Sequence, residues 1–245
     1  MSGAPVLQTR ALSVRRGHRL TLDALDLAVP AGSVYALLGG NGAGKTTTLN
    51  ALLGFVAAAS GQALVDGIDA SRDPQAARSR LAYLPENVAL YPYLTGIENL
   101  RYFCQLSGIA LGTGEAGALL SGSDLAQKSQ GLRVAGYSKG MRQKVGLAIA
   151  RARRACAMLL DEPTSGLDPA AANEFAQSVL EARRDGMAVL MVTHDLFNAL
   201  EVADRIGILK EGKLVAEFDA RDVAHEELQR VYLQHARGTL EAHPS

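Results

Sequence analysis

The 245-residue sequence has few cysteines, no excess of charge of either sign and no long hydrophobic run. Its two cysteines, Cys104 and Cys156, lie far apart in apolar surroundings, which favours packed, reduced thiols over a disulfide or a metal site. The chain carries 25 basic and 25 acidic side chains, so its formal net charge is zero. A nucleic-acid-binding protein would show a basic excess or stripe, and we therefore expect no nucleic-acid partner.

The apolar runs have strand length, as in Met187 to Val192, whereas a membrane-spanning helix needs about 20 residues. The first ten residues, MSGAPVLQTR, lack the apolar segment of a secretory signal. The sequence thus predicts a soluble protein. A transport function would require a separate chain to form the path through the membrane.

Strand and helix patterns alternate near the start of the chain. Apolar residues recur at strand spacing between Leu20 and Val29, which predicts half-buried antiparallel strands. The apolar run Val34 to Leu38 then meets a glycine-rich turn. A helical face follows, carried by Leu49, Leu52, Leu53 and Val56. Strand, glycine loop and helix in this order form the unit that builds parallel α/β sheets.

The same alternation returns in the second half. Ala157 to Leu160 reads as a buried strand, and Asp168-Pro169 as a helix start with Asp as the cap. Met187 to Thr193 predicts the next strand, after which Asp195 can cap another helix. A hairpin with its turn at Glu211-Gly212 follows.

The stretch from Pro85 to Arg154 shows helical signals without strand runs. Its clearest amphipathic face consists of Met141, Val145, Ala148, Ile149 and Ala152. We therefore expect one domain over residues 1–245. It comprises a core of about 1–84 and 155–220, an inserted helical subdomain of about 85–154, and a C-terminal helix with a loose tail over about 221–245.

Residues 39–46 match the phosphate-binding pattern G-x-x-x-x-G-K-[ST] in full. Such a loop turns its backbone N–H groups toward the β- and γ-phosphates, and the following helix adds its positive end. Lys45 supplies a mobile positive charge, and the Thr46 hydroxyl can ligate Mg²⁺. The residues expected to bind ATP here are Gly39, Gly40, Asn41, Gly42, Ala43, Gly44, Lys45, Thr46 and Thr47. The loop alone does not choose among kinases, GTPases and motor ATPases.

Two adjacent acids, Asp161 and Glu162, end the strand that begins at Ala157. Ligands bind at the carboxyl edge of parallel sheets, and adjacent strand residues face opposite ways, so the two acids need not share a task. Asp161 is suited to hold Mg²⁺, and Glu162 to orient or deprotonate the attacking water. The alternative is a strand that merely ends in solvated acids.

Three segments carry a family resemblance. Residues 160–169, LDEPTSGLDP, resemble the Walker B and D-loop segment of ATP-binding-cassette (ABC) ATPases. Residues 137–143, YSKGMRQ, resemble the signature motif of that family, and residues 192–195, VTHD, resemble its switch-histidine loop. Order and spacing match from about residue 6 to residue 220. The expected fold class is therefore α/β: a P-loop NTPase core with a mixed parallel sheet, an antiparallel β subdomain and an inserted helical subdomain.

The resemblance implies a head-to-tail dimer that encloses two ATP molecules with Mg²⁺. Each ATP would contact the P-loop of one chain and the signature of the other, where Ser138, Lys139 and Gly140 lie. It also implies that His194 contacts the γ-phosphate. Asp168 would act across the dimer interface, which is compatible with its role as a helix cap. A second copy of the chain is the expected partner, with a heterodimer left open.

Three positions depart from the family pattern. Arg16 precedes Gly17 where an aromatic residue often stacks on adenine, so Arg16 or His18 would stack instead. The signature reads YSKGM and keeps only its serine and second glycine in their usual places. Glu86 occupies the usual position of the Q-loop glutamine, where a carboxylate can still reach Mg²⁺ or the attacking water.

The LPE loop and the YSKGM signature are similar to a branch of the family that commonly serves export-type permeases for drugs, polysaccharides, lipids, sodium or copper maturation. The implied function is an ATPase at the cytoplasmic face of a bacterial inner membrane that drives a separate integral membrane permease. Residues 90–100 would receive the permease, although their aromatic side chains could equally be ordinary core.

Other functions compete with this prediction. A soluble ABC ATPase acting on nucleic acid or ribosomes usually fuses two cassettes or carries basic insertions, whereas this chain has one cassette and zero net charge. A P-loop kinase or GTPase would leave the signature unexplained. A degenerate nucleotide sensor is disfavoured because Lys45, Asp161, Glu162 and His194 are all present.

Overall fold

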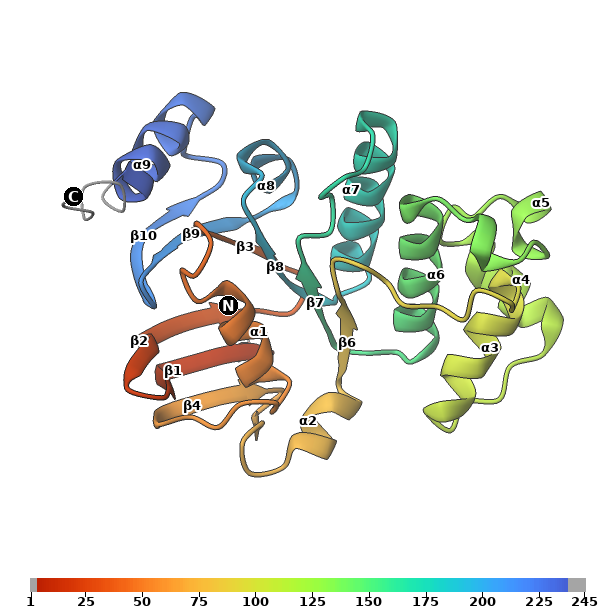
Figure 1. Ribbon diagram of the computed structural model, residues 1–245, viewed down its shortest axis with the longest axis horizontal. Coiled ribbons are helices and arrows are strands. Elements are labelled where there is room, and N and C mark those ends of the chain that lie inside the picture. The colour runs from red at the N-terminus through yellow and green to blue at the C-terminus, as the bar shows by residue number, and fades with distance from the viewer. Residues whose placement is uncertain (1–3, 238–245) are drawn as a thin grey trace.

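The computed structural model describes residues 4–237 (Figure 1). Its elements are, in chain order, β1 (Leu7–Arg16), β2 (Arg19–Val29), β3 (Val34–Leu38), α1 (Lys45–Leu52), β4 (Ser60–Val65), β5 (Ile68–Asp69), α2 (Pro74–Ser79), β6 (Leu81–Leu84), α3 (Gly96–Leu106), α4 (Thr113–Ser121), α5 (Gln127–Gln130), a 3₁₀ turn (Val134–Gly136), α6 (Lys139–Ala152), β7 (Ala157–Asp161), α7 (Pro169–Arg184), β8 (Ala188–Thr193), α8 (Leu196–Val202), β9 (Arg205–Lys210), β10 (Lys213–Asp219) and α9 (His225–Arg237).

A six-stranded sheet of order β10-β9-β3-β8-β7-β6 forms the centre of the molecule. β10 pairs with β9 in antiparallel register, and the other neighbours are parallel. Successive residues of a strand face opposite sides. Leu37 and Leu159 therefore pack on one face of the sheet, and Leu38 and Leu160 on the other. Because both faces are covered, these strands are apolar throughout.

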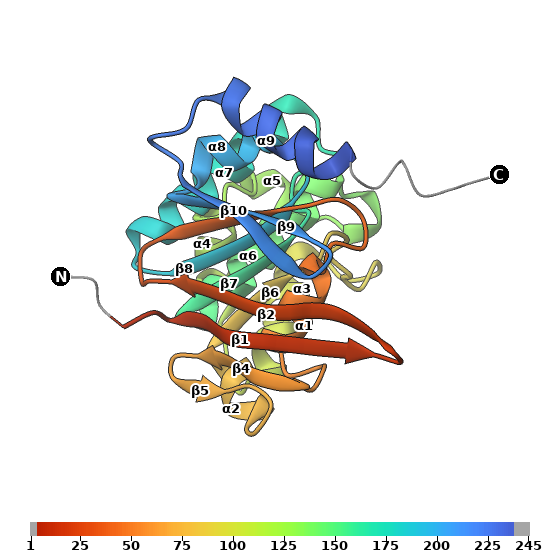
Figure 2. The same ribbon diagram turned by 90° about the vertical axis from the view of Figure 1, so that its left-hand side faces the viewer.

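A four-stranded antiparallel sheet of order β2-β1-β4-β5 covers one face, together with α1. Helices α7, α8 and α9 cover the opposite face, as Figure 2 shows. Helices α3 to α6 gather at the far side of β6 and β7, where they share a separate apolar cluster that contains Leu100, Leu120 and Val145 (Figure 1). The α/β fold with a mixed sheet and an antiparallel sheet is thus as predicted.

The carboxyl ends of the parallel strands β3, β6, β7 and β8 meet at one edge of the central sheet. Leu38 of β3 pairs with Thr193 of β8, and Asp161 of β7 pairs with Val192. Leu84 of β6 pairs with Leu160. This register brings together the four loops that follow these strands, although the loops are far apart in sequence. Ligands of open α/β sheets bind at such an edge.

Several local expectations are confirmed, and some boundaries differ. Asp168 and Asp195 cap α7 and α8 as predicted, each through hydrogen bonds from backbone N–H groups of the first turn. The helix after the glycine loop ends at Leu52, so Val56 lies outside it. Gly54 adopts a positive φ of 68°, which α-helix excludes and glycine tolerates.

The start of the terminal helix and the burial of one cysteine differ from the expectations. The terminal helix begins at His225 rather than near Arg221, and the predicted loose tail lies outside the described residues from 238 onward. Both cysteines are free; Cys104 is buried as expected, but Cys156 is only partly buried. Burial raises the pKa of both thiols. Across residues 4–237, no helix is both long and apolar enough to cross a bilayer.

Candidate functional site

The glycine loop between β3 and α1 packs closely against the β9–β10 hairpin. A Cβ at Gly39 would lie 2.6 Å from the carbonyl oxygen of Leu209, so the loop approaches β9 more closely than a side chain allows. Gly44 precedes α1 with a φ of 114°, a conformation that glycine adopts without the penalty that a Cβ imposes. The backbone N–H of Gly212 donates to Ala43 O at 2.8 Å and fastens the hairpin turn to the loop.

Lys45 folds back over this loop. Its Nζ donates to Gly39 O at 2.6 Å and lies 3.6 Å from Glu162 Oε1, and the residue is largely buried. A buried ammonium is stable only with such partners. An anion bound in the loop would offer stronger partners than a backbone carbonyl, so Lys45 is placed to receive a phosphate.

Asp161 ends β7 and faces the loop. Burial raises the pKa of this carboxyl, and the negative charge of Glu162 raises it further. Tyr83, on β6, donates its hydroxyl to Asp161 Oδ2 at 3.4 Å, and burial next to Asp161 raises the pKa of Tyr83 to about 12. A half-buried carboxylate beside a second acid favours a cation, which is the property required of a metal ligand.

Glu162 follows Asp161 with a φ of 46°, in the left-handed region that few non-glycine residues adopt. Such strain costs about 1–3 kcal/mol and requires support from the surroundings. Its Oε2 accepts hydrogen bonds from Thr193 Oγ1 at 3.1 Å and from the His194 backbone N–H at 3.2 Å. His194 Nδ1 lies 2.8 Å from the same oxygen. The loop after β8 thus holds one carboxylate oxygen, and Oε1 remains directed at Lys45.

Glu86 follows β6 and contacts a different set of groups. Ser165 Oγ donates to Glu86 Oε1 at 3.1 Å, and Lys139 Nζ lies 3.8 Å from that oxygen. Lys139 Nζ also donates to the carbonyl oxygen of Ser165 at 2.5 Å. The Q-loop position, the signature and the loop after Glu162 are therefore connected within one chain.

The signature lies at the start of α6. Ser138 caps this helix by accepting a hydrogen bond from Met141 N at 3.2 Å, and a Cβ at Gly140 would meet the side chain of Ala171 at 3.4 Å. Gln143, one turn further along α6, is buried and donates from Nε2 to the carbonyl oxygen of Pro163. The signature helix is thus attached directly to the segment that follows the catalytic carboxylate candidate.

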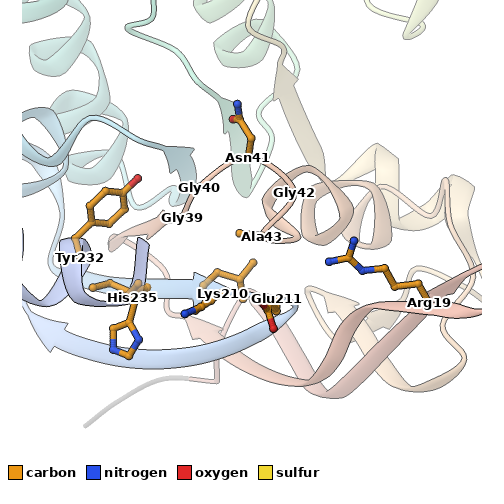
Figure 3. A pocket seen from close by; sticks show the side chains of 12 residues that line it. Arg19, Gly39, Gly40, Asn41, Gly42, Ala43, Lys210, Glu211, Tyr232 and His235 are labelled. Carbon is orange, nitrogen blue, oxygen red and sulfur yellow. The ribbon is translucent and has the colours of Figure 1, made fainter. Parts of the chain in front are cut away.

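A cleft of about 470 Å³ opens over the glycine loop. Most of the residues predicted to bind ATP or Mg²⁺ line it, namely Arg16, Gly40, Asn41, Gly42, Ala43, Gly44, Lys45, Thr46, Thr47, Glu86 and Asp161. The predicted catalytic residue Glu162 lines it as well. A smaller pocket adjoins it on the other side of the loop and includes Gly39 (Figure 3). Among the residues that line the cleft there is no member of the signature, and neither His194 nor Asp168.

Sequence reasoning missed several residues of the site. Arg19, Thr21 and Glu211 also line the cleft. In Figure 3 the guanidinium of Arg19 lies on one side of the loop, and Tyr232 and His235 of α9 lie on the other. The sequence does predict a turn at Glu211, but its place beside the loop follows from the pairing of β9 with β3, which no local pattern encodes.

The residues present fit a magnesium ion that is held jointly with a nucleotide. Within residues 4–237, no group of three His, Cys, Asp or Glu side chains is arranged to hold a metal by itself. Mg²⁺ commonly takes one or two protein oxygen ligands and completes its shell with phosphate and water. Thr46, Asp161 and Glu86 all line the cleft and supply such oxygens.

The comparisons with known proteins agree with this geometry. A family model described as "ABC transporter" matches residues 22–165, more than half of the chain. The ABC transporter ATP-binding protein YdbJ of Bacillus subtilis (strain 168) is 33% identical over 223 residues, covering 87% of this chain and 69% of its own length. The daunorubicin resistance ATP-binding protein DrrA2 of Streptomyces coeruleorubidus is 36% identical over 216 residues, covering 86% of this chain and 66% of its own length.

Solved structures give the same result. A structure described as the ATP-binding subunit of an ABC transporter superposes with a TM-score of 0.81 at 29% identity and covers 94% of this chain. A dimeric ATP-binding cassette in a post-hydrolysis state with ADP and Pi has the same fold, with a TM-score of 0.76 at 24% identity and 89% of this chain covered. The fold and the cleft define an ATP-binding ATPase. The chain belongs to the ABC transporter family, as its ATP-binding part.

Proposed function

We propose that this chain is the ATP-hydrolysing subunit of an export-type ABC transporter. Two copies would associate head to tail around two Mg-ATP molecules, and the closed dimer would act on a separate membrane permease. One observation carries the proposal: the signature residues do not line the described cleft of their own chain. Ser138 caps α6 outside that cleft, so its contact with ATP requires a second copy.

We infer a task for each group in the cleft from its position. Lys45 and the loop N–H groups would bind the β- and γ-phosphates. Thr46, Asp161 and Glu86 would hold Mg²⁺, which supplies neutralisation of the negative charge on the phosphates during transfer. A phosphate that draws Lys45 away would leave Glu162 Oε1 free to accept a proton from the attacking water, while Oε2 stays fixed by the loop after β8.

His194 and Asp168 complete the proposed dimeric site. The imidazole of His194 is 65% exposed and is held at Glu162 through Nδ1, so its other nitrogen is available to a γ-phosphate. Asp168 uses Oδ1 to cap α7, accepting from Ala171 N at 2.9 Å, and Oδ2 remains for a contact across the interface. Arg16 lies in the cleft wall and is our candidate for stacking on adenine.

The export direction and the permease rest on similarity. Matching relatives include the daunorubicin resistance protein named above and a probable multidrug ABC transporter ATP-binding protein, YbhF of Escherichia coli (strain K12), which is 34% identical. The exposed Tyr91 and Tyr102 form an aromatic group with the partly buried Phe103 on the helical side of the molecule, and Tyr93, two residues after Tyr91, is also exposed. We propose this group as the contact with the permease, which would hold the subunit at the cytoplasmic face of the membrane.

The variant Glu162→Gln tests the proposal. The amide keeps the shape of the side chain but cannot accept a proton, so ATP hydrolysis should stop while ATP-dependent dimers accumulate in size-exclusion chromatography with Mg²⁺. Glu201→Gln, an exposed residue on α8, is the matched control and should hydrolyse ATP normally. Full turnover by Glu162→Gln, or its failure to dimerise with ATP, would contradict the proposed mechanism.

A second experiment separates a transporter from the soluble rival. The tagged chain is purified from membranes in mild detergent, and the proteins that come with it are identified. A membrane protein with several spanning helices is expected. Recovery of ribosomes or nucleic acid instead would favour the soluble alternative.

A further inference from the structure

Two of the departures from the family pattern lie against each other in space. Glu86 stands at the Q-loop position and Lys139 in the signature, and they are 53 positions apart in the sequence numbering. Their charges are opposite, and Lys139 Nζ lies 3.8 Å from Glu86 Oε1. Each departure from the usual pattern thus supplies a partner for the other.

The pair is held by a third residue. Ser165 donates its hydroxyl to Glu86 Oε1 at 3.1 Å, and its carbonyl oxygen accepts from Lys139 Nζ at 2.5 Å. The Lys139 side chain is 25% exposed and that of Glu86 is 47% exposed. Both side chains contact Ser165, and that of Lys139 is largely shielded from solvent. The pair therefore has a defined geometry that an isolated surface ion pair lacks.

The charge balance of the cleft explains why Glu86 requires this partner. Three carboxylates, Glu86, Asp161 and Glu162, lie along the cleft, and Lys45 is committed to Glu162. Because the three carboxylates share one cleft, their negative charges repel each other before a cation enters. A lysine that draws Glu86 toward Ser165 relieves this repulsion.

We propose that Lys139 is a positioning residue that holds Glu86 on the signature side of the cleft, and that Mg-ATP binding must detach Glu86 from it. Lys139 follows Ser138, which serves the other nucleotide of the dimer. Under the proposed function, the pair therefore links the nucleotide that a chain binds to the signature that it presents to its partner. Only this last step depends on the dimer.

The competing role for Lys139 is direct contact with a nucleotide across the dimer interface, as the sequence resemblance implies. The two roles differ in what Glu86 does. A positioning lysine acts through Glu86, so replacing it has no further effect once Glu86 has lost its charge. A lysine that contacts the nucleotide acts whether or not residue 86 is charged.

A double-mutant cycle separates these roles. Lys139→Met keeps the length of the side chain and removes its charge, and Glu86→Gln is isosteric. The dissociation constant of a non-hydrolysable ATP analogue with Mg²⁺ is measured by calorimetry for the wild type, both single variants and the double variant. Binding should tighten by about two- to five-fold on Lys139→Met when Glu86 is present. It should not change on Lys139→Met in the Glu86→Gln background.

Other outcomes overturn the proposal. An equal effect of Lys139→Met in both backgrounds would show that Lys139 acts without Glu86, and no effect in either background would show an inert surface pair. Lys139→Arg retains the charge, so the dissociation constant of the analogue should stay at the wild-type value. With Mg²⁺ chelated, Lys139→Met should have the same effect on analogue binding in both backgrounds, because Lys139 and Mg²⁺ are proposed to compete for Glu86.

The same helix provides a matched control pair. Lys144 of α6 lies 2.6 Å from Glu174 of α7 and also bonds a backbone carbonyl, that of Asp124. Lys144→Met and Glu174→Gln should leave analogue binding unchanged, and a comparable effect from them would assign the result to general electrostatics. Binding to a single chain requires no dimer. Failure of this cycle is therefore distinct from failure of Glu162→Gln to dimerise.

Discussion

Replacing Thr193 by Val tests whether the loop after β8 orients Glu162. The Thr193 hydroxyl is fully enclosed; it donates to Glu162 Oε2 at 3.1 Å and accepts from the backbone N–H of Asp195 at 3.0 Å. Valine has nearly the same shape but can do neither. The substitution therefore removes one hydrogen bond to a charged group and leaves the partly buried N–H of Asp195 without this partner.

The expected loss follows from these two bonds. A hydrogen bond to a charged group contributes roughly 1.5–3 kcal/mol, and a neutral one roughly 0.5–1.5 kcal/mol, before the gain from burying a methyl group. A net destabilisation of about 2 kcal/mol corresponds to a decrease in Tm of roughly 4–8 °C for a domain of this size. If about 1.4 kcal/mol of this is lost from the orientation of Glu162, kcat falls about ten-fold.

Thermal unfolding and steady-state ATPase assays measure both effects. Thr193→Ser is the control, because it keeps the hydroxyl and loses only a methyl group. It should retain most of the activity, although a small cavity lowers its stability. Val and Ser variants with equal kcat values, both near that of the wild type, would refute the argument that the hydroxyl positions Glu162.

Two further predictions concern Asp161 and Asp168. Because the folded-state pKa of Asp161 is raised, its ionised form destabilises the nucleotide-free protein at neutral pH, and this cost disappears as pH falls below the unfolded value of about 4. Asp161→Asn should therefore raise the Tm at pH 7.5 and raise it less at pH 4, and Mg-ATP should no longer stabilise the variant. A lower Tm of the variant at pH 7.5 would contradict this. Asp168→Ala removes the hydrogen bond that caps Ala171 N and should lower the free energy of unfolding by about 1 kcal/mol. Asp168→Asn should keep the cap. Urea unfolding in the absence of nucleotide measures both variants. Equal stability of these two variants would show that the cap contributes nothing.

The parts of the site that depend on local sequence were predictable. The glycine loop requires small residues, a lysine and a hydroxyl at fixed spacing, so its position between β3 and α1 followed from residues 34–53. The caps of α7 and α8 were predictable for the same reason, since Asp168 and Asp195 bond N–H groups two or three residues away. The end of a helix was harder to predict where it depends on a single residue in the left-handed conformation, as at Gly54 after α1.

Contacts between distant loops could not be predicted in this way. The bond from Thr193 to Glu162 depends on the register of β7 against β8, which pairs Asp161 with Val192. A shift of one residue would turn Thr193 to the opposite face of the sheet. The sequence identified Glu162 and His194 as separate candidates, but their 2.8 Å contact exists only because that register is set by burial on both faces.

The pairing of Glu86 with Lys139 extends this reasoning to departures from a motif. Taken singly, an acid in place of the usual glutamine and a lysine within the signature are two unrelated departures from the family pattern. Each change alone would leave a charge without this partner near the cleft, where an unpaired charge costs more than in water. Together they produce one ion pair that spans the cleft wall and the start of α6. A departure from a motif is therefore best judged after its neighbours in space are known, because the compensating residue can lie in another motif of the same chain.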